Sequence, residues 1–304
     1  MKQTSLKLLI TSLLILVNCI AYGQGCSDAG FCTINSFQPN NAANISEFNN
    51  QIKFGLTFGG ADQSISILGN YLEYSRQIKD KFVVHAKITS LSQSGNEIST
   101  FGLSDIYLNG DYKANKNFKL SAGIKIPLAN GNTEKDNLPL PMDYQSSLGT
   151  LDIVLGIGYE IKKIQIVAGF QQPLTQNKNS FTAENYPQNS KLRKFQSTNN
   201  YKRSGDILLR ISYPIKLGQK FMLTPSLLPI YHIANDKYTD LQNIERDIEG
   251  SQGLTLNGNV YFDYNLNRKH ALQLNAGMPF VVRETRPDGL TRGFVVNLEY
   301  HYKF

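Results

Sequence analysis

The sequence predicts an all-β fold, a transmembrane antiparallel β-barrel of about 12 strands with short periplasmic turns and long extracellular loops. Three observations lead to this fold class. Apolar and polar residues alternate along many segments, short and long connections alternate between those segments, and aromatic residues gather at one end of them. Alternation with a period of two is expected of strands whose two faces meet different surroundings.

The last segment shows the alternation most clearly. One face of residues 292–304 carries Phe294, Val296, Leu298, Tyr300, Tyr302 and Phe304. The opposite face carries Val295, Asn297, Glu299, His301 and Lys303. A soluble sheet with its core on the apolar side would show the same pattern. In a barrel, the apolar face meets lipid, the polar face meets the lumen, and the last strand closes the ring against the first.

The same pattern defines the other strands, and helical periodicity is hard to find after the first residues. The predicted strands are 51–59, 66–77, 81–91, 102–113, 117–127, 150–161, 163–174, 205–214, 219–233, 252–264, 269–282 and 292–304. Pro225 and Pro229 disturb the ninth strand, because proline cannot donate to a ladder, so its phase stays open.

The connections sort into two kinds from the second strand onward. The short ones each contain lysine or arginine: "QIKDK", "KANKN", "EIKK", "KLGQK" and "NLNRKH". The long ones are "SLSQSGNEISTF", 128–150, 175–204, 234–251 and "RETRPDGLTR". An even strand count places both termini and the short turns in the periplasm and the long loops outside. A β-sandwich has no reason to sort its loops in this way.

Aromatic residues mark the short-turn ends of the strands. They are predicted to form a girdle at the membrane interface, and its members are Phe82, Phe118, Phe221, Tyr112, Tyr159, Tyr213, Tyr264, Tyr302 and Phe304. A terminal aromatic residue also resembles the signal by which the barrel-assembly machinery recognises the C-terminal strand.

The chain divides into three parts: a signal peptide (1–23), an N-terminal segment (24–50) and the barrel (51–304). The signal peptide has a lysine-bearing start, an apolar stretch and small residues before the cleavage site. That stretch is too short for a transmembrane anchor. After cleavage, the protein is expected in the outer membrane of a Gram-negative bacterium.

The N-terminal segment contains Cys26 and Cys32, which are predicted to form a disulfide in an exported protein. A lipid-anchored Cys26 and a metal pair are the alternatives. The segment is polar and rich in Asn and Gly. It serves either as a periplasmic tether or as a plug that enters the lumen.

Three strands begin alike, with an aspartate seven residues before a tyrosine. The phase places Asp105, Asp152 and Asp206 in the lumen, near the extracellular mouth. They form an acidic cluster that acts on a solute, or each pairs with loop amides or with a basic residue, which is the favoured interpretation. The other charged residues expected in the lumen have mixed signs, which argues against a strongly ion-selective pore; they are His85, Lys87, Lys119, Lys125, Arg210, Glu299 and His301, together with Lys53, Asp111, Glu160 and Lys303.

Residues 101–160, with "FGLSDIYLNGDYK", "FKLSAGIKIPLANGNTEKDN" and "LPLPMDYQSSLGTLDIVLGIGYE", resemble a bacterial outer-membrane family. That family is labelled for the meta-cleavage pathway of phenol degradation, and its members are described as transporters. The resemblance implies a membrane barrel that passes small aromatic or hydrophobic molecules. The "CSDAGFC" leader departs from the family pattern.

These patterns predict a channel or transporter for passive or facilitated diffusion of a small-molecule solute, with no cofactor or metal. The alternative is a non-conducting surface structural or adhesive barrel. A barrel-embedded lipid hydrolase is less favoured, because no catalytic constellation is evident. The net charge of +7 is spread over turns and loops, so no nucleic acid is expected. The expected partners are outer-membrane lipid and lipopolysaccharide. The basic loop 175–204 either binds lipopolysaccharide or pairs with the acidic loop 234–251.

Overall fold

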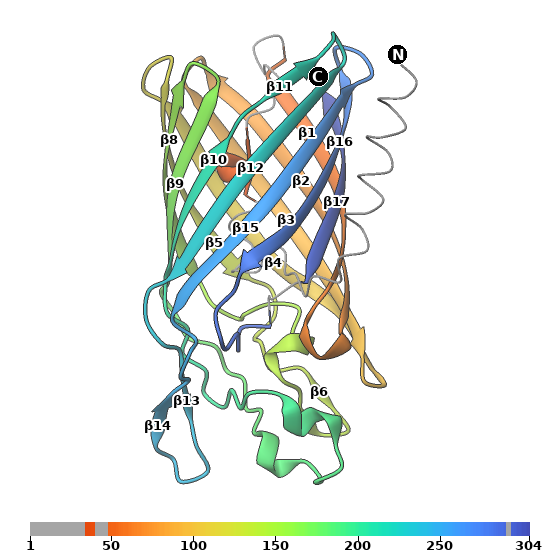
Figure 1. The fold of residues 1–304 in the computed structure, drawn as a ribbon, viewed down its shortest axis with the longest axis vertical. Coiled ribbons are helices and arrows are strands. Elements are labelled where there is room, and N and C mark those ends of the chain that lie inside the picture. Colours follow the sequence, from red (N-terminus) through yellow and green to blue (C-terminus); the bar gives the residue numbers. More distant parts are fainter. Residues whose placement is uncertain (1–33, 40–47, 290–292) are drawn as a thin grey trace, which may run out of the picture.

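The computed structural model describes residues 34–39, 48–289 and 293–304. Within them, twelve strands form a closed antiparallel barrel (Figure 1). The barrel strands are β1 (Asn50–Gly60), β2 (Ser66–Lys79), β3 (Phe82–Gly95), β4 (Ile98–Lys113), β5 (Phe118–Pro127), β8 (Asp152–Ile161), β9 (Ile164–Pro173), β10 (Asp206–Ser212), β12 (Phe221–His232), β15 (Gly253–Asn265), β16 (His270–Val281) and β17 (Phe294–Lys303). The predicted fold class is confirmed.

Two strand pairings close the ring. β17 pairs with β1 from Lys303↔Gln51 to Phe294↔Gly60, and β10 pairs with β12. Two backbone hydrogen bonds between Asn50 and Phe304, at 3.0 and 3.1 Å, extend the first seam to the last residue. A closed ring leaves no strand edge, so the backbone polar groups are paired within the barrel wall.

The eighth strand is interrupted at Pro214, which has no N–H to donate. β11 (Ile215–Leu217) continues along β12 in the same register, because Ser212 pairs with Ser226 and Ile215 with Leu223. The strand predicted over 205–214 is therefore longer than expected, and it is broken between Ser212 and Ile215.

The two faces of the wall differ as the alternation predicts. The outer face exposes large apolar side chains such as Phe54, Leu72 and Leu155, whereas Lys53 and Lys125 are buried inside. Apolar outside and polar inside is the arrangement of a barrel that spans a lipid bilayer. Among the residues described, no helix is long and apolar enough to cross a membrane.

The nine predicted girdle residues lie on the outer face, toward the short turns. Phe221 stacks on Tyr264 with ring centroids 4.7 Å apart, and Tyr302 stacks on Phe304 at 5.4 Å. Their contact with the membrane interface stays a prediction.

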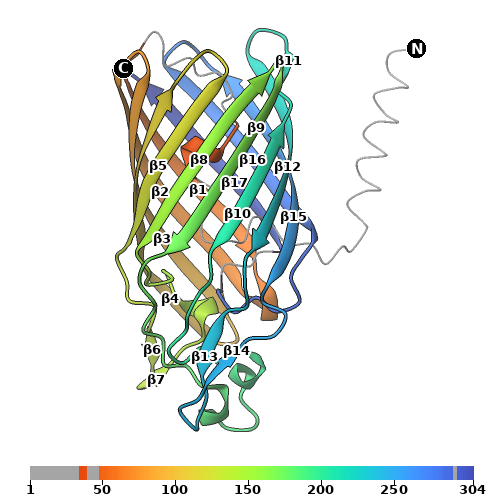
Figure 2. The ribbon, with the colours of Figure 1, turned by 90° about the vertical axis from the view of Figure 1, so that its left-hand side faces the viewer.

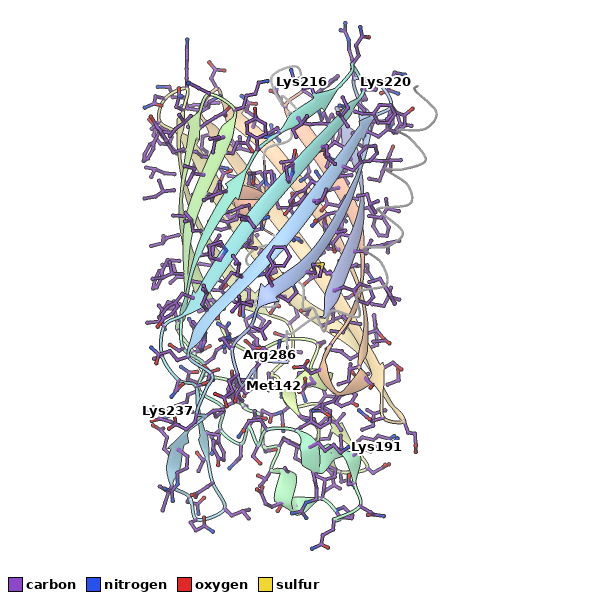
Figure 3. The ribbon with its side chains drawn as sticks, viewed as in Figure 1. Met142, Lys191, Lys216, Lys220, Lys237 and Arg286 are labelled. Atoms are coloured by element: carbon purple, nitrogen blue, oxygen red, sulfur yellow. The ribbon has the colours of Figure 1, made fainter. Side chains whose placement is uncertain are left out.

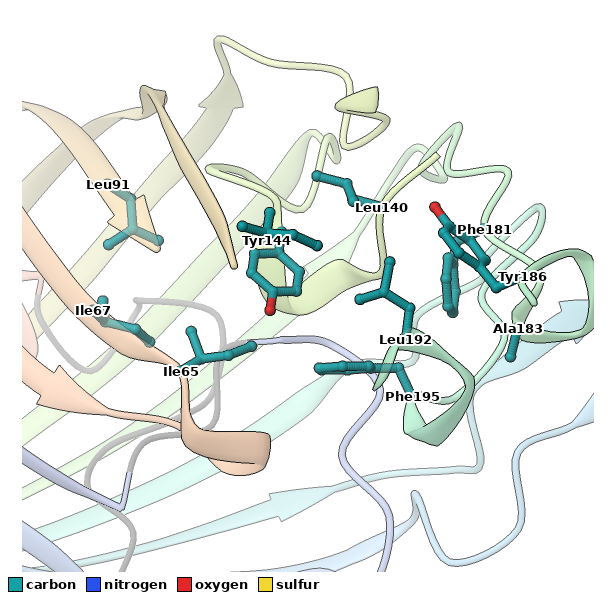
Figure 4. Packing of buried hydrophobic residues seen from close by; sticks show 11 residues of the cluster. Ile65, Ile67, Leu91, Leu140, Tyr144, Phe181, Ala183, Tyr186, Leu192 and Phe195 are labelled. Atoms are coloured by element: carbon teal, nitrogen blue, oxygen red, sulfur yellow. The ribbon is translucent and has the colours of Figure 1, made fainter. Parts of the chain in front are cut away.

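The long connections form a cap at the other end of the barrel, where Figure 3 labels Met142, Lys191, Lys237 and Arg286 opposite Lys216 and Lys220. Its elements are η4 (Asp62–Ser64), β6 (Glu134–Lys135), β7 (Leu138–Pro139), η5 (Met142–Tyr144), η6 (Ala183–Asn185), η7 (Lys191–Lys194), β13 (Lys237–Thr239) and β14 (Glu245–Asp247). The cap has its own hydrophobic cluster (Figure 4), formed by Ile65, Ile67, Leu91, Ile98, Leu140, Tyr144, Phe181, Ala183, Tyr186, Leu192 and Phe195. Apolar contact between loops and strand ends therefore holds the cap in place.

Loops 175–204 and 234–251 contact each other. Lys202 and Lys237 form a backbone bridge, and both of their side chains pair with Glu245. Pairing between the basic and the acidic loop is thus present in the structure.

The prediction of a long loop between the third and fourth strands is wrong. Instead of a loop over residues 92–101, β3 and β4 continue to a two-residue turn at Asn96 and Glu97, which both have positive φ, 52° and 66°. Two such residues are characteristic of the tight turns that join antiparallel strands. The hairpin extends among the cap loops, where Gln93 donates to the carbonyl of Gln145 at 2.5 Å, so its polar side chains are satisfied there.

Candidate functional site

The ten lumen residues in the predicted solute path all face inward. Lys119 is half-buried, and none of the other nine is more than 7% exposed: Asp105, Asp152, Asp206, His85, Lys87, Lys125, Arg210, Glu299 and His301. Lys53, Asp111 and Lys303 also face the lumen. Glu160 is exposed, because β8 reaches the short-turn end of the barrel there.

Each of the three aspartates has donor partners of its own. Asp152 pairs with Lys125 at 2.8 Å. Asp105 accepts hydrogen bonds from Ser147 at 2.7 Å and from Ser104 at 2.9 Å. Asp206 pairs with an arginine and a histidine, described next. The structure therefore brings each carboxylate to a donor, as expected for charges removed from bulk water.

A buried ionic network, here called the mouth cluster, joins the long-loop ends of β10 and β12 to three loops. None of its members is more than 3% exposed: Tyr201, Arg203, Asp206, His232, Asp236, Arg283 and Asp288. The His232 ring lies between two carboxylates, with Nδ1 2.7 Å from Asp206 and Nε2 2.8 Å from Asp236. Both nitrogens can donate only when the ring is an imidazolium.

The arginines complete the network. Arg203 lies 2.6 Å from Asp206 and 3.5 Å from Asp288, and Arg283 lies 3.0 Å from Asp288. Burial alone would lower the pKa of Arg203, but the Asp206 and Asp288 carboxylates raise it well above its usual value. With His232 protonated, three cations meet three carboxylates, so the mouth cluster is balanced in charge.

Sequence reasoning missed most of the mouth cluster. Arg203, Asp236, Arg283 and Asp288 lie in connections, where no periodicity tells which way a side chain points. The direction of the His232 side chain could not be predicted, because two prolines left the phase of the ninth strand open. The one available signal was spacing, because Arg203 and Asp206 are three residues apart at a strand start.

A second group of charges lines the wall formed by β1, β2, β3 and β17. Lys53 lies 3.7 Å from Glu73, and His301 lies 2.9 Å from Glu299. The Lys87 ammonium lies 3.8 Å from the centre of the Tyr71 ring, a cation–π geometry. This charged wall therefore contains two pairs of opposite charge and one lysine placed over an aromatic ring.

The opposite wall has an apolar patch. Val154, Val167, Leu208, Leu228 and Ile230, from β8, β9, β10 and β12, are buried inside the barrel. The lumen is therefore amphipathic, with one charged side and one apolar side.

A short piece of the N-terminal segment, residues 34–39, lies between the two walls. Figure 2 shows it inside the barrel, in the half nearer the short turns, where η2 (Asn35–Phe37) contacts β8 and β9. Ile34 and Phe37 pack on the apolar patch. Asn35 and Ser36 bond to the charged side, since Lys53 donates to Asn35 Oδ1 at 2.6 Å and Ser36 Oγ donates to Asp111 at 2.5 Å.

Several predicted features lie outside the described residues. The signal peptide and both Cys26 and Cys32 fall there, so their disulfide stays a prediction. Among the described residues, no group of three or more His, Cys, Asp and Glu side chains is arranged to hold a metal ion. Three of the chain's four histidines face the lumen, and His270 stacks on Tyr302 on the outside, at 5.1 Å between ring centres.

The wall and its two faces define a transmembrane β-barrel. No family model and no curated protein sequence matches the chain, so the resemblance to the phenol-degradation family stays a prediction. Solved outer-membrane proteins match in shape at very low identity. A KdgM porin has a TM-score of 0.44 and 8% identity, over 84% of this chain and 99% of that one. The CymD monoaromatic hydrocarbon channel has a TM-score of 0.43 and 8% identity, over 94% of this chain and 95% of that one. The translocator domain of the autotransporter NalP from Neisseria meningitidis has a TM-score of 0.46 and 9% identity, over 84% of this chain and 88% of that one.

The cap also holds a carboxyl group with an unusual affinity for its proton. Asp143 lies in η5, near the ion pair formed by Asp62 and Arg286 at 2.6 Å. Burial, reinforced by the Asp62 carboxylate, raises the pKa of Asp143 to about 7. The cap is therefore sensitive to pH near neutrality.

Breaking the mouth cluster should destabilise the protein. Asp206→Asn removes the carboxylate that Arg203 and His232 share. Removing one partner of a buried ion pair typically costs about 3–5 kcal/mol of stability. Denaturant unfolding of the refolded barrel measures this loss. As a control, Glu97→Gln breaks the exposed Glu97–Lys191 pair and should cost less than about 1 kcal/mol. Equal stabilities of the two variants would contradict a structural role for the cluster.

Asp143→Asn should stabilise the cap at high pH but not at low pH. In the unfolded chain the pKa is about 3.9, so between that pH and about 7 the folded protein holds a proton that the unfolded chain has released. Stability of the native protein therefore falls as pH rises through this window, by an amount on the order of 2–4 kcal/mol. Denaturation midpoints at pH 4 and pH 8 test this. A constant difference between variant and native protein would show that Asp143 does not titrate in this range.

Proposed function

We propose that the protein is an outer-membrane channel for passive or facilitated diffusion of small molecules, and that residues 34–39 act as a plug. One observation carries the proposal. A short piece of chain lies inside the lumen, in the half nearer the short turns, in addition to the side chains of the wall. Eight-stranded barrels are filled by their own side chains, and porins of 16 or more strands leave a wide channel. A barrel of intermediate size with a peptide inside fits a narrow passage that can open.

The charge pattern supports a passage for small solutes of no particular sign. Lys125 is paired with Asp152, Lys53 with Glu73, and Lys119 with Asp111 at 3.3 Å. A path lined by neutral pairs offers hydrogen bonds without a strong field, so size and contact with the walls decide which solute passes.

The same proposal includes the location and partners of the protein. The signal peptide directs export, the barrel resides in the outer membrane, and the girdle aromatics contact the interface on the periplasmic side. Lipopolysaccharide contacts the basic loop 175–204, although Lys202 and Lys191 already pair with Glu245 and Glu97. The barrel-assembly machinery engages the C-terminal strand.

A non-conducting surface barrel is the second candidate, and the cap favours it. The cap has a hydrophobic cluster of its own and a charge-balanced mouth cluster beneath it. A rigid mouth of this kind presents a fixed outer surface, which suits a structural or adhesive role.

Removing the plug should raise conductance. A variant without residues 24–47 keeps Asn50 and its seam with Phe304, and should conduct several-fold more than the full mature chain in planar bilayers, because the plug no longer occupies the lumen. A solute-flux assay in liposomes gives a second readout. If the folded variant stays silent in both, the closed surface barrel becomes the better explanation.

A further inference from the structure

The seat of the plug has the chemistry of a binding site. We infer that the lumen pocket now filled by Ser36 and Phe37 is the solute-binding site of the channel, and that it takes a small aromatic molecule carrying a hydroxyl group on a short arm. The plug competes with this solute for the same contacts. The inference rests on the proposed function, because it names the solute of that same passage.

The ring half of the site is shaped by a missing side chain. A Cβ on Gly156 would lie 2.3 Å from Phe37 Cε1 and 2.8 Å from its Cζ, far inside contact distance. Phe37 is only 1% exposed and belongs to the same buried apolar cluster as Val154, Val167 and Leu208. A flat apolar slot against bare backbone suits an aromatic ring.

The polar half of the site offers a hydroxyl group one hydrogen-bond acceptor and one hydrogen-bond donor. Ser36 Oγ donates to Asp111 Oδ1 at 2.5 Å and accepts from Asn109 Nδ2 at 2.7 Å. Lys119 donates to the Ser36 carbonyl oxygen at 3.0 Å. A carboxylate in place of the hydroxyl would face Asp111 with like charge. A neutral alcohol fits better than an acid.

The site belongs to the barrel and not to the plug. Its ring half comes from β8, β9 and β10, and its polar half from Asn109 and Asp111 of β4 and Lys119 of β5. Strands locked in a closed ring hold these groups in place whether or not the plug is present. Within the described residues 34–39, the plug contacts the wall through hydrogen bonds of Asn35 and Ser36 and through the apolar side chains of Ile34 and Phe37, so a solute with the same contacts can replace it.

A matched pair of glycines provides the test. Gly156 and Gly158 lie on the same face of β8, and the three atoms nearest to a Cβ on Gly158 all belong to Lys119, the first at an ordinary 3.4 Å. Gly156→Ala fills the ring slot, whereas Gly158→Ala leaves it open. Both are made in the full mature chain, and heat-modifiability on gels confirms that each barrel folds.

The experiment measures binding of 2-phenylethanol to the detergent-solubilised proteins by saturation-transfer NMR. We expect saturable binding to the native protein, unchanged binding to Gly158→Ala and binding at least tenfold weaker to Gly156→Ala. Ethylbenzene, which lacks the hydroxyl, and ethanol, which lacks the ring, should both bind more weakly than 2-phenylethanol.

Competition by the plug gives an independent readout. Ser36→Ala removes two hydrogen bonds of the plug but no group of the wall, so 2-phenylethanol should bind roughly three- to tenfold more tightly to this variant. Equal binding to the two glycine variants, or no gain in Ser36→Ala, would overturn the inference. Conductance after plug removal without this binding pattern would leave the proposed channel standing and reject only the site.

Discussion

Closure of the ring is the constraint on which the rest of the structure depends. In a bilayer, a backbone N–H or C=O in the barrel wall must find a partner in a neighbouring strand, and the ring must return to its first strand. The prolines show how little freedom this leaves. Between Leu208↔Ile230 and Ile211↔Leu227 the β10–β12 ladder skips the pairs at Pro229 and its neighbour, yet the register is the same on both sides. Because the register is kept, each side chain stays on its own face.

Once the faces are fixed, the interior has to accommodate its own charges. A lysine such as Lys125, which is fully buried, is tolerable only with a close carboxylate, and Asp152 supplies it at 2.8 Å. The same requirement explains why the mouth cluster carries three possible cations and three carboxylates. It also explains why the plug presents Asn35 and Ser36 to the charged wall and Ile34 and Phe37 to the apolar patch.

Much of the wall was predictable from sequence because alternation encodes which way a side chain points. The inward positions of Asp152, Lys125 and Arg210 followed from phase alone. The partners in the loops did not, because Arg203 and Asp288 belong to no periodic segment. The hairpin at Asn96 was mistaken for a loop for a related reason: beyond the membrane a strand needs no apolar face, so its polar sequence resembles a connection. The position of residues 34–39 depends on contacts with at least five strands, which no local pattern contains.

The cap and the plug differ in how they are built, and this difference bears on which of them moves. The cap is joined by a hydrophobic cluster and by the mouth cluster, whose charges would each lose a partner if a loop withdrew. Opening there carries the penalty of unpaired buried charge. The plug withdraws at a lower cost, because Lys119 keeps Asp111 and Lys53 keeps Glu73 after Asn35 and Ser36 have left. Apolar contact at Phe37 is then the main contribution lost, and a ring from a solute can restore it. Because these two ion pairs persist when the plug leaves, the barrel is suited to exchanging that plug for a ligand.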